Sequence, residues 1–334
     1  MQRIITKKEL FSKIEELLKD YEVIGPKEIP NKGIFYANIT DIKDLYLGNG
    51  FTIEPIKKFF LNPSEWLFCE NFGEGGLSLE NTPLPENRRI IIGARPCETR
   101  GLTLLDKVFN SDYKDNFYLH NRQRTFIVGL GCIHPDKSCF CTSLDGSPVE
   151  LKGMDAYLLE IGPDTFFFET INDGLGDIFS NFGREFTEED KDTLEKTKHD
   201  CINRIEKKIR IPETLERVFE SDYWSEVSFA CISCGICTYL CPTCHCFDLL
   251  DEERKRLRCY DGCAFKDFTL QASGENPRPT KRERYRQRVF HKFDYFKKNF
   301  GENLCVGCGR CIRYCPVKMD IAEIVNKIPV TRPT

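Results

Sequence analysis

Two cysteine runs near the C-terminus constrain this chain more than any other feature. Each run has the spacing C-x2-C-x2-C-x3-C and is followed directly by a proline. The two runs consist of Cys231, Cys234, Cys237 and Cys241, and of Cys305, Cys308, Cys311 and Cys315. This spacing is the one with which thiolates bind a [4Fe-4S] cube, because two residues between ligands let a tight loop turn its sulfurs onto different irons. Gly235 and Gly309 lie inside the loops, and without a Cβ atom they can adopt left-handed backbone angles.

In two-cluster ferredoxins the fourth cysteine of each run serves the other cube. We therefore expect two crossed ligand sets. They are Cys231, Cys234, Cys237 and Cys315 for the first cube, and Cys305, Cys308, Cys311 and Cys241 for the second. Zinc ribbons use paired C-x2-C units, and disulfide frameworks are typical of small secreted chains, so neither explains two runs of four.

Composition indicates a protein of the reducing cytoplasm, although the chain has 18 cysteines. Residues 1–8 contain no apolar signal core, and no stretch approaches the roughly 20 apolar residues of a membrane span. The net charge of −4 argues against bulk attraction to nucleic acid. Exposed cubes are often oxygen-labile, which agrees with an anaerobic setting.

The first two thirds of the chain carry the pattern of an α/β domain. Residues 89–94 and 125–130 are apolar strands separated by a helical segment, which predicts a βαβ unit in a mixed, partly parallel sheet. We expect further strands at 21–24, 33–39, 156–161 and 165–170, and helices at 7–19 and 187–209. Residues 55–85 contain several prolines and glycines and read as irregular structure around a short helix.

Four more cysteines follow the two strands of that βαβ unit. They are Cys97, Cys132, Cys139 and Cys141. The C-terminal ends of parallel strands meet at one edge of a sheet, so these side chains should lie close together. We interpret them as a further metal site. A third iron–sulfur cluster, a zinc ion and simple buried cysteines all remain open.

The fold class expected is α+β with two domains. Residues 1–222 form the N-terminal α/β domain that carries the Cys97, Cys132, Cys139 and Cys141 site, and residues 223–334 form an α-helical ferredoxin-like domain with two clusters. The helical assignment depends on the long insert between the two runs, where 247–257 and 281–299 are expected to be helices.

The insert also contains Cys244, Cys246, Cys259 and Cys263, which could be neighbouring thiols, alternative ligands, a redox pair or another metal site. Cys69 and Cys201 have no assigned role. Residues 281–292 are basic and aromatic; such a segment could be a solvated face, a nucleic-acid surface or a set of cations that offset cluster charge.

Several segments together resemble a known family. They are residues 93–100, the stretch from Cys132 to Ser143, residues 231–246, residues 291–293 and residues 305–311. Over residues 50–325 the chain is similar to the family of sulfhydrogenase beta subunits and anaerobic sulfite reductase A subunits, with a closer likeness to the sulfhydrogenase branch. The resemblance implies a cytoplasmic subunit of a multi-subunit oxidoreductase that works beside a flavin/NAD(P)H-binding subunit and a catalytic subunit.

Three functions are therefore weighed. The first is a non-catalytic electron-transfer subunit, since the chain has no G-x-G-x-x-G, G-x-S-x-G or Walker motif. It would serve hydrogen or sulfur-compound redox chemistry, and alternatives are the A subunit of an anaerobic sulfite reductase or a heterodisulfide-reductase-linked complex. The second is a sulfur-substrate reductase with its own cluster or thiol site, and the third is an iron–sulfur regulator that binds nucleic acid.

Overall fold

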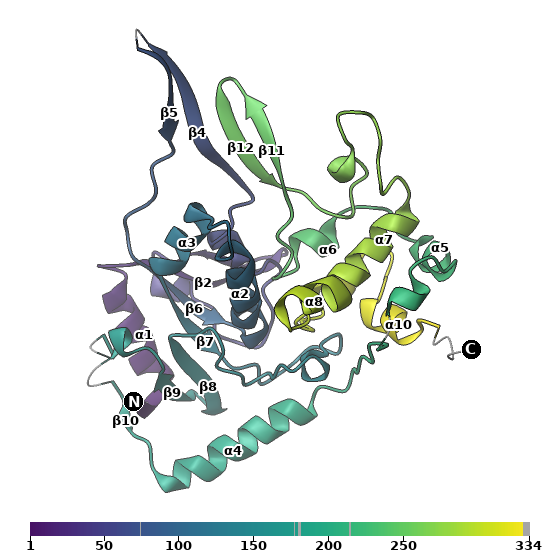
Figure 1. The fold of residues 1–334 in the computed structure, drawn as a ribbon. Helices are drawn as coiled ribbons and strands as arrows, with labels where there is room; N and C mark the ends of the chain where they lie inside the picture. The colour runs from purple at the N-terminus through teal and green to yellow at the C-terminus, as the bar shows by residue number, and fades with distance from the viewer. Residues whose placement is uncertain (74, 177, 180–181, 214, 330–334) are drawn as a thin grey trace. The chain divides into compact units, whose positions relative to one another are not determined.

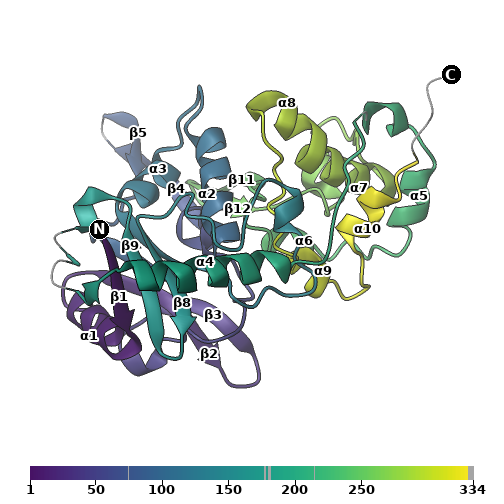
Figure 2. The same ribbon diagram turned by 90° about the horizontal axis from the view of Figure 1, so that it is seen from below.

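The structure is a computed structural model, and it describes residues 1–73, 75–176, 178–179, 182–213 and 215–329. The chain forms two compact units. Unit 1 comprises Met1–Ile56, Glu86–Lys207 and the short segment Val306–Gly309, and unit 2 comprises Lys57–Pro85, Lys208–Cys305 and the segment that begins at Arg310. Figures 1 and 2 show the elements of both units in two views.

Unit 1 is built on an eight-stranded sheet in the order β10-β1-β9-β8-β7-β6-β2-β3. Its strands are β1 (Gln2–Thr6), β2 (Glu22–Ile29), β3 (Gly33–Asn38), β6 (Arg89–Ala94), β7 (Thr125–Leu130), β8 (Ala156–Gly162), β9 (Thr165–Thr170) and β10 (Arg184–Glu185). The central neighbours β2, β6, β7 and β8 are parallel, and the outer pairs are antiparallel. The expected βαβ unit and the mixed, partly parallel sheet are confirmed.

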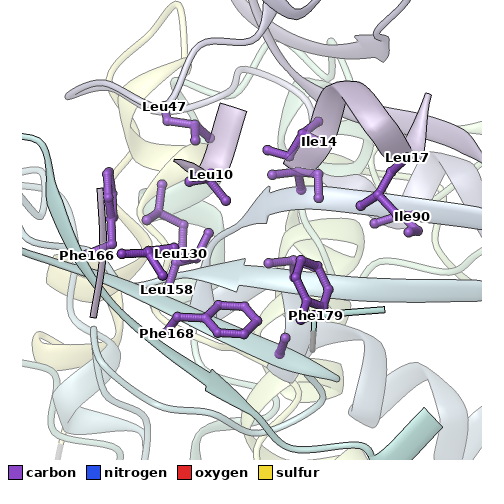
Figure 3. Close-up of a cluster of buried hydrophobic side chains, with 14 of the residues drawn as sticks. Leu10, Ile14, Leu17, Leu47, Ile90, Leu130, Leu158, Phe166, Phe168 and Phe179 are labelled. Atoms are coloured by element: carbon purple, nitrogen blue, oxygen red, sulfur yellow. The ribbon is translucent and has the colours of Figure 1, made fainter. Parts of the chain in front are cut away.

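Helices cover both faces of this sheet. They are α1 (Lys7–Leu17), α2 (Pro96–Phe109), α3 (Asn116–Gln123) and α4 (Glu188–Asn203). Alternate strand residues belong to opposite cores: Phe166 and Phe168 pack in the core with Ile14 of α1, whereas Phe167 packs with Leu194 of α4. Figure 3 shows the first of these cores. The helix expected over residues 187–209 is shorter than the sequence pattern predicts, because α4 ends at Asn203.

Unit 2 combines short helices with a second sheet. Its helices are α5 (Tyr223–Ser228), α6 (Ile236–Tyr239), α7 (Lys281–Phe290), the π-helix η7 (His291–Tyr295), α8 (Phe296–Phe300), α9 (Arg310–Arg313) and α10 (Ile321–Asn326). The run α7-η7-α8 is the helix expected at 281–299. The aromatic rings of Trp224 and Phe290 pack edge to face between α5 and α7, with centroids 5.7 Å apart.

The second sheet corrects two expectations from the sequence. Its strands are β4 (Ser64–Gly73), β5 (Gly76–Asn81), β11 (Phe247–Glu252) and β12 (Lys255–Tyr260), in the order β11-β12-β4-β5. Residues 247–257, expected to be helical, therefore lie in a hairpin, and much of 55–85 is a hairpin rather than irregular structure. Among the described residues, short 3-10 helices also occur: η1 (Ile42–Asp44), η2 (Ile56–Phe59), η3 (Cys141–Ser143), η4 (Asp173–Leu175), η5 (Leu215–Val218) and η6 (Asp267–Thr269).

Turn geometry and strand pairing explain why 247–257 is not a helix. Glu253 and Arg254 both have positive φ (46° and 68°), as the two-residue turn of a twisted hairpin requires. Arg258 of β12 then forms a buried ion pair with Glu65 of β4. Charged residues with good helix propensity are thus held as strands by a pairing partner almost 200 residues away in sequence.

Candidate iron–sulfur sites

The loop of the first cysteine run curls around its own sulfurs. Ser233 and Gly235 have positive φ (56° and 75°), and α6 begins directly after Gly235. The backbone N–H of Ser233 donates to the Sγ of Cys231 over 3.4 Å. Such N–H groups stabilise thiolate charge, which is what a cluster ligand needs. Since α6 is short, it carries Cys237 inside the helix and Cys241 just beyond its end.

The second run repeats this local geometry. Gly307 and Gly309 have positive φ (66° and 70°), and α9 begins at the next residue. The fourth cysteine of this run also accepts a hydrogen bond: the backbone N–H of Met319 donates to the Sγ of Cys315 over 3.3 Å. Identical spacing therefore produces nearly the same loop twice.

A cavity of about 50 Å³ in unit 2 brings the ligand set expected for the first cube together. Its lining includes Cys231, Cys234, Cys237 and Cys315, from both runs. Cys311 and Cys263 line the same cavity. Four thiols that line one cavity, with backbone N–H donors at two of them, are the type of donor set that a [4Fe-4S] cube requires.

The second expected set is distributed differently. Cys241, Cys305 and Cys311 belong to unit 2, and Cys308 belongs to the unit 1 segment Val306–Gly309. Cys241 and Cys305 are both buried. The side chain of Lys292 donates from Nζ to the Sγ of Cys241 over 3.3 Å, so this thiol too has a cationic donor.

Buried cations on α7 and η7 surround the cysteines of unit 2. Arg284, Arg288 and Lys292 are each less than a tenth exposed, and they follow one another at intervals of four residues. Arg288 donates to the carbonyl of Cys237 (3.1 Å) and to the Sγ of Cys244 (3.8 Å). Lys57 is also buried and donates to the carbonyl of Cys244 over 2.7 Å.

These contacts set the protonation of the neighbouring thiols. A hydrogen bond from Cys244, together with Lys292, Arg288 and Lys57, holds the pKa of Cys241 well below its usual range. Cys244 is the protonated partner, and that hydrogen bond raises its pKa. Burial lowers the pKa of Lys292, but the Cys241 and Cys244 thiols outweigh it and the net pKa is raised. Cys241 is thus the thiolate of the pair, and Cys244 is the thiol.

The sequence pattern did contain a signal for these cations. From the sequence, residues 281–292 can form a solvated face, a nucleic-acid surface or a set of cations that balance cluster charge. The i, i+4, i+8 spacing of Arg284, Arg288 and Lys292 places these three side chains on one helix face. That face is buried, whereas Lys281 and Arg286 bind backbone carbonyls of Cys231 and Phe219. Lys57 lies more than 180 residues away in sequence from Cys241, so no local pattern could have found it.

The four N-terminal cysteines line a second cavity, of about 20 Å³, in unit 1. Cys97 lies in the first turn of α2, directly after β6, and Cys132 follows β7. Cys139 lies in the loop that leads into η3, and Cys141 is the first residue of η3. Burial raises the pKa of Cys141 to about 12, with Cys132 adding to the effect. Parallel pairing of β6 with β7 explains the convergence, because both strands end at the same edge.

Other cysteines lie around these sites without a defined ligand role. Cys263 lines the first cavity, Cys244 contacts Cys241, and Cys259 lies on β12. Burial raises the pKa of Cys246 to about 11 and that of Cys201 to about 11. Within the described ranges, no three His, Cys, Asp or Glu side chains form a group that could hold a single metal ion.

The part of the chain that the structure describes contains no helix of sufficient length and apolar character to cross a membrane.

Comparison with known proteins agrees with these sites. The family described as "4Fe-4S dicluster domain" matches residues 230–319, which include both cysteine runs and the cation-bearing helix. Sulfhydrogenase 2 subunit beta of Pyrococcus furiosus is 30% identical over 343 residues, which cover 96% of this chain and 95% of that protein. No solved structure matches the chain. With two cysteine runs of cluster-binding geometry and a relative of this identity over nearly its whole length, the chain belongs to the sulfhydrogenase beta subunit family and is an iron–sulfur electron-transfer subunit.

Proposed function

We propose that this subunit relays electrons through [4Fe-4S] clusters between a flavin/NAD(P)H-binding partner and a catalytic partner of a sulfhydrogenase-like complex. The reaction served is the redox chemistry of hydrogen or sulfur compounds. The name of the Pyrococcus furiosus relative, a beta subunit, implies that members of this family work with other subunits. A flavin partner is proposed because this sequence has no dinucleotide-binding motif after any strand.

The first cavity is the observation that carries the proposal. It is lined by the four cysteines assigned to the first cube, although Cys315 is 78 positions from the nearest of the others in sequence. Chance burial of single cysteines does not produce such a set. When bound there, a [4Fe-4S] cluster takes up and releases one electron at a time, and the surrounding residues hold it, shield it and balance its charge.

The individual ligands follow from the same arrangement. We assign Cys231, Cys234, Cys237 and Cys315 to the first cube and Cys305, Cys308, Cys311 and Cys241 to the second. We further assign Cys97, Cys132, Cys139 and Cys141 to a third iron–sulfur site, supported by the cavity that they line together. Residues 223–334 are proposed to be the two-cluster, ferredoxin-like domain, with residues 1–222 as the N-terminal domain.

Metal content and spectroscopy of the anaerobically purified chain test the proposal. Two filled cubes correspond to about eight irons per chain, and a third adds about four. The reduced protein should give iron–sulfur EPR signals, should reoxidise reversibly, and should accept electrons from a reduced flavoprotein. The isolated chain should not consume hydrogen, polysulfide or sulfite.

Turnover of polysulfide or sulfite by the isolated chain would instead favour a reductase with its own site. A chain that binds fewer than about eight irons, or whose iron is redox-silent, would contradict the relay function. Co-purification with a sulfite-reducing partner or a heterodisulfide-reducing partner, in place of a hydrogenase, would move the assignment to the alternative complexes.

A further inference from the structure

The four-stranded sheet of unit 2 has two edges, and they differ in character. The sheet runs in the order β11-β12-β4-β5, so β11 is one edge strand and β5 is the other. β11 carries the acidic residues Asp248, Asp251 and Glu252, and such charges protect an edge from pairing with another strand. β5 has one charged residue, Glu80, and all six of its residues are exposed. The β5 edge therefore lacks the protection that the β11 edge has.

Three large apolar side chains lie exposed on one face of the sheet beside the β5 edge. Phe72 of β4 is 63% exposed, and Leu77 and Leu79 of β5 are 59% and 60% exposed. Phe72 pairs with Leu77 across the two strands, and Leu79 lies two residues further along β5, so the three side chains share one face. Arg254 lies over the Phe72 ring, 5.1 Å from its centroid, and most of the Phe72 side chain is exposed nevertheless. Exposed apolar residues grouped in this way indicate a binding surface.

The backbone of β5 is oriented for pairing with a further strand. The N–H of Glu70 in β4 donates to the carbonyl of Arg254, on the β12 side, over 2.7 Å. Glu70 and its partner Leu79 therefore exchange no backbone hydrogen bonds, because such pairs alternate with bonded pairs in an antiparallel ladder. The N–H and C=O groups of Leu79 consequently face the outer edge of β5, and those of Leu77 do so by the two-residue period. An added strand can form hydrogen bonds with these groups.

The charge of the β4–β5 hairpin selects the kind of strand that fits this edge. Residues 59–87 contain five glutamates and neither lysine nor arginine. One of them, Glu65, is paired with Arg258, whereas Glu80 on β5 is exposed. A complementary strand thus presents apolar side chains to the two leucines of β5 and a basic side chain to Glu80. Pairing between two copies of this chain would instead place two acidic hairpins side by side, which like-charge repulsion disfavours.

We propose that β5 is the docking edge for a partner subunit, which adds an extended segment of alternating apolar and basic residues as a fifth strand of this sheet. The backbone hydrogen bonds of the added strand supply affinity, and contacts with Leu77, Leu79 and Glu80 supply specificity. The inference rests on the proposed function in one respect, the existence of partner subunits in a multi-subunit complex. It adds the surface of this chain that binds one of them.

Anaerobic purification of the complex through a tag on this chain, followed by native mass spectrometry at increasing salt, tests the proposal. Leu79→Asp places a charge on the apolar face, and Leu79→Pro removes the outward N–H without removing a hydrogen bond to β4. Each should weaken the binding of the partner subunit about tenfold or more. Leu249→Asp is the matched control and should retain the partner, because Leu249 is an exposed leucine (42%) on the protected β11 edge. Full retention of the partner in both Leu79 variants would overturn the proposal.

Hydrogen–deuterium exchange of the wild-type chain, with and without its partner, needs no variant and measures the edge directly. The amides of Leu77 and Leu79 should exchange about tenfold more slowly or less in the complex, whereas the amides of β11 should keep their rates. Exchange at Leu77 and Leu79 that the partner does not slow would contradict strand addition. Glu80→Gln should also make assembly less sensitive to salt, and an unchanged salt dependence would overturn the basic character of the added strand.

Three further outcomes separate this inference from the alternatives and from the proposed function. Self-association of the wild-type chain that Leu79→Asp abolishes, with the partner still bound, would assign the edge to a second copy and overturn the proposal. An iron-loaded, reversibly reducible chain whose partner binding is the same in the Leu79 variants would overturn the docking edge and leave the electron-transfer function intact. A wild-type chain that purifies without any partner subunit would overturn both.

Discussion

The two cysteine runs have the same spacing and nearly the same loop, yet they are built into different surroundings. In the first run, a Cβ on Gly235 would meet the aromatic ring of Phe265. In the second, a Cβ on Gly309 would meet the backbone carbonyl of Ser138 at 2.6 Å. The loop of the first run thus packs against the Phe265 side chain of unit 2. The loop segment Val306–Gly309 of the second run packs against the backbone of the N-terminal cysteine loop. The cysteine spacing thus predicts the ligand set of each run, whereas the residues that pack on each loop determine its surroundings.

The largest expected effect compares ligand loss in the two runs. Cys234→Ser removes a ligand of the first cube, so about four irons should be lost and the EPR signal of that cube should disappear, while the second cube persists. Iron analysis and EPR measure the result. Cys69→Ser, which changes a cysteine on β4, is the control and should keep all iron. Equal iron in both variants would show that the first cavity is not a cluster site.

Substituting the two loop glycines tests the difference in what covers them. Gly309→Ala should destabilise the protein by several kcal/mol, since the positive φ alone costs about 1–2 kcal/mol and the clash is with backbone. Gly235→Ala has a similar φ, but the Phe265 ring can shift, so the loss should be closer to about 1–2 kcal/mol. Anaerobic denaturant unfolding measures both. Equal losses would remove the distinction between the two loops.

Removing the cation beside Cys241 should shift a reduction potential without removing iron. Lys292→Met eliminates a positive charge and the N–H···S contact of 3.3 Å, both of which favour the reduced, more negative cluster. The potential of the cube that Cys241 serves should therefore fall. An EPR-monitored redox titration resolves the change for each cube. Lys297→Met, an exposed lysine on α8, should leave the potentials unchanged; an unaltered titration of Lys292→Met would exclude the tuning role.

The smallest expected effect concerns His245, which follows the first run and has no counterpart after the second. Burial lowers its folded-state pKa to about 4, below the value of about 6.5 for an unfolded chain. Stability from the neutral ring is fully present above pH 6.5 and declines as the pH falls. Between pH 7.5 and 5.5 the loss should be about 1 kcal/mol, measured by unfolding at fixed iron content. His245→Asn should flatten this dependence, whereas the exposed His199→Asn should not.

Much of unit 1 could be predicted because its signals are local. The strands at 89–94 and 125–130 are buried on both faces of the sheet, and their continuous runs of apolar residues predict this burial. The parallel pairing then predicted that Cys97 and Cys132 would emerge together, and they line one cavity. The metal that this cavity holds stays a prediction. The strand β1 was missed, because five residues beside a helix give too short a pattern.

Unit 2 was harder to predict, because its second sheet depends on pairing across long sequence distances. Residues 247–257 have the charge and leucine content of a helix, yet β12 pairs with β4, and Arg258 meets Glu65. No local pattern identifies that partner. The four-residue spacing of Arg284, Arg288 and Lys292 places them on one helix face, but the spacing does not tell whether that face is buried or solvated.

The sequence by itself determined the two cluster-binding loops, since cysteine spacing and glycine positions act over a few residues and need no distant partner. Only the tertiary structure decided which thiols line the same cavity, which cations contact them, and which loop packs against the segment Val306–Gly309 of the second run. The physical reason is that these contacts are long-range: Gly307 meets Cys141 and Lys57 meets Cys244 through packing of segments that are more than 160 residues apart.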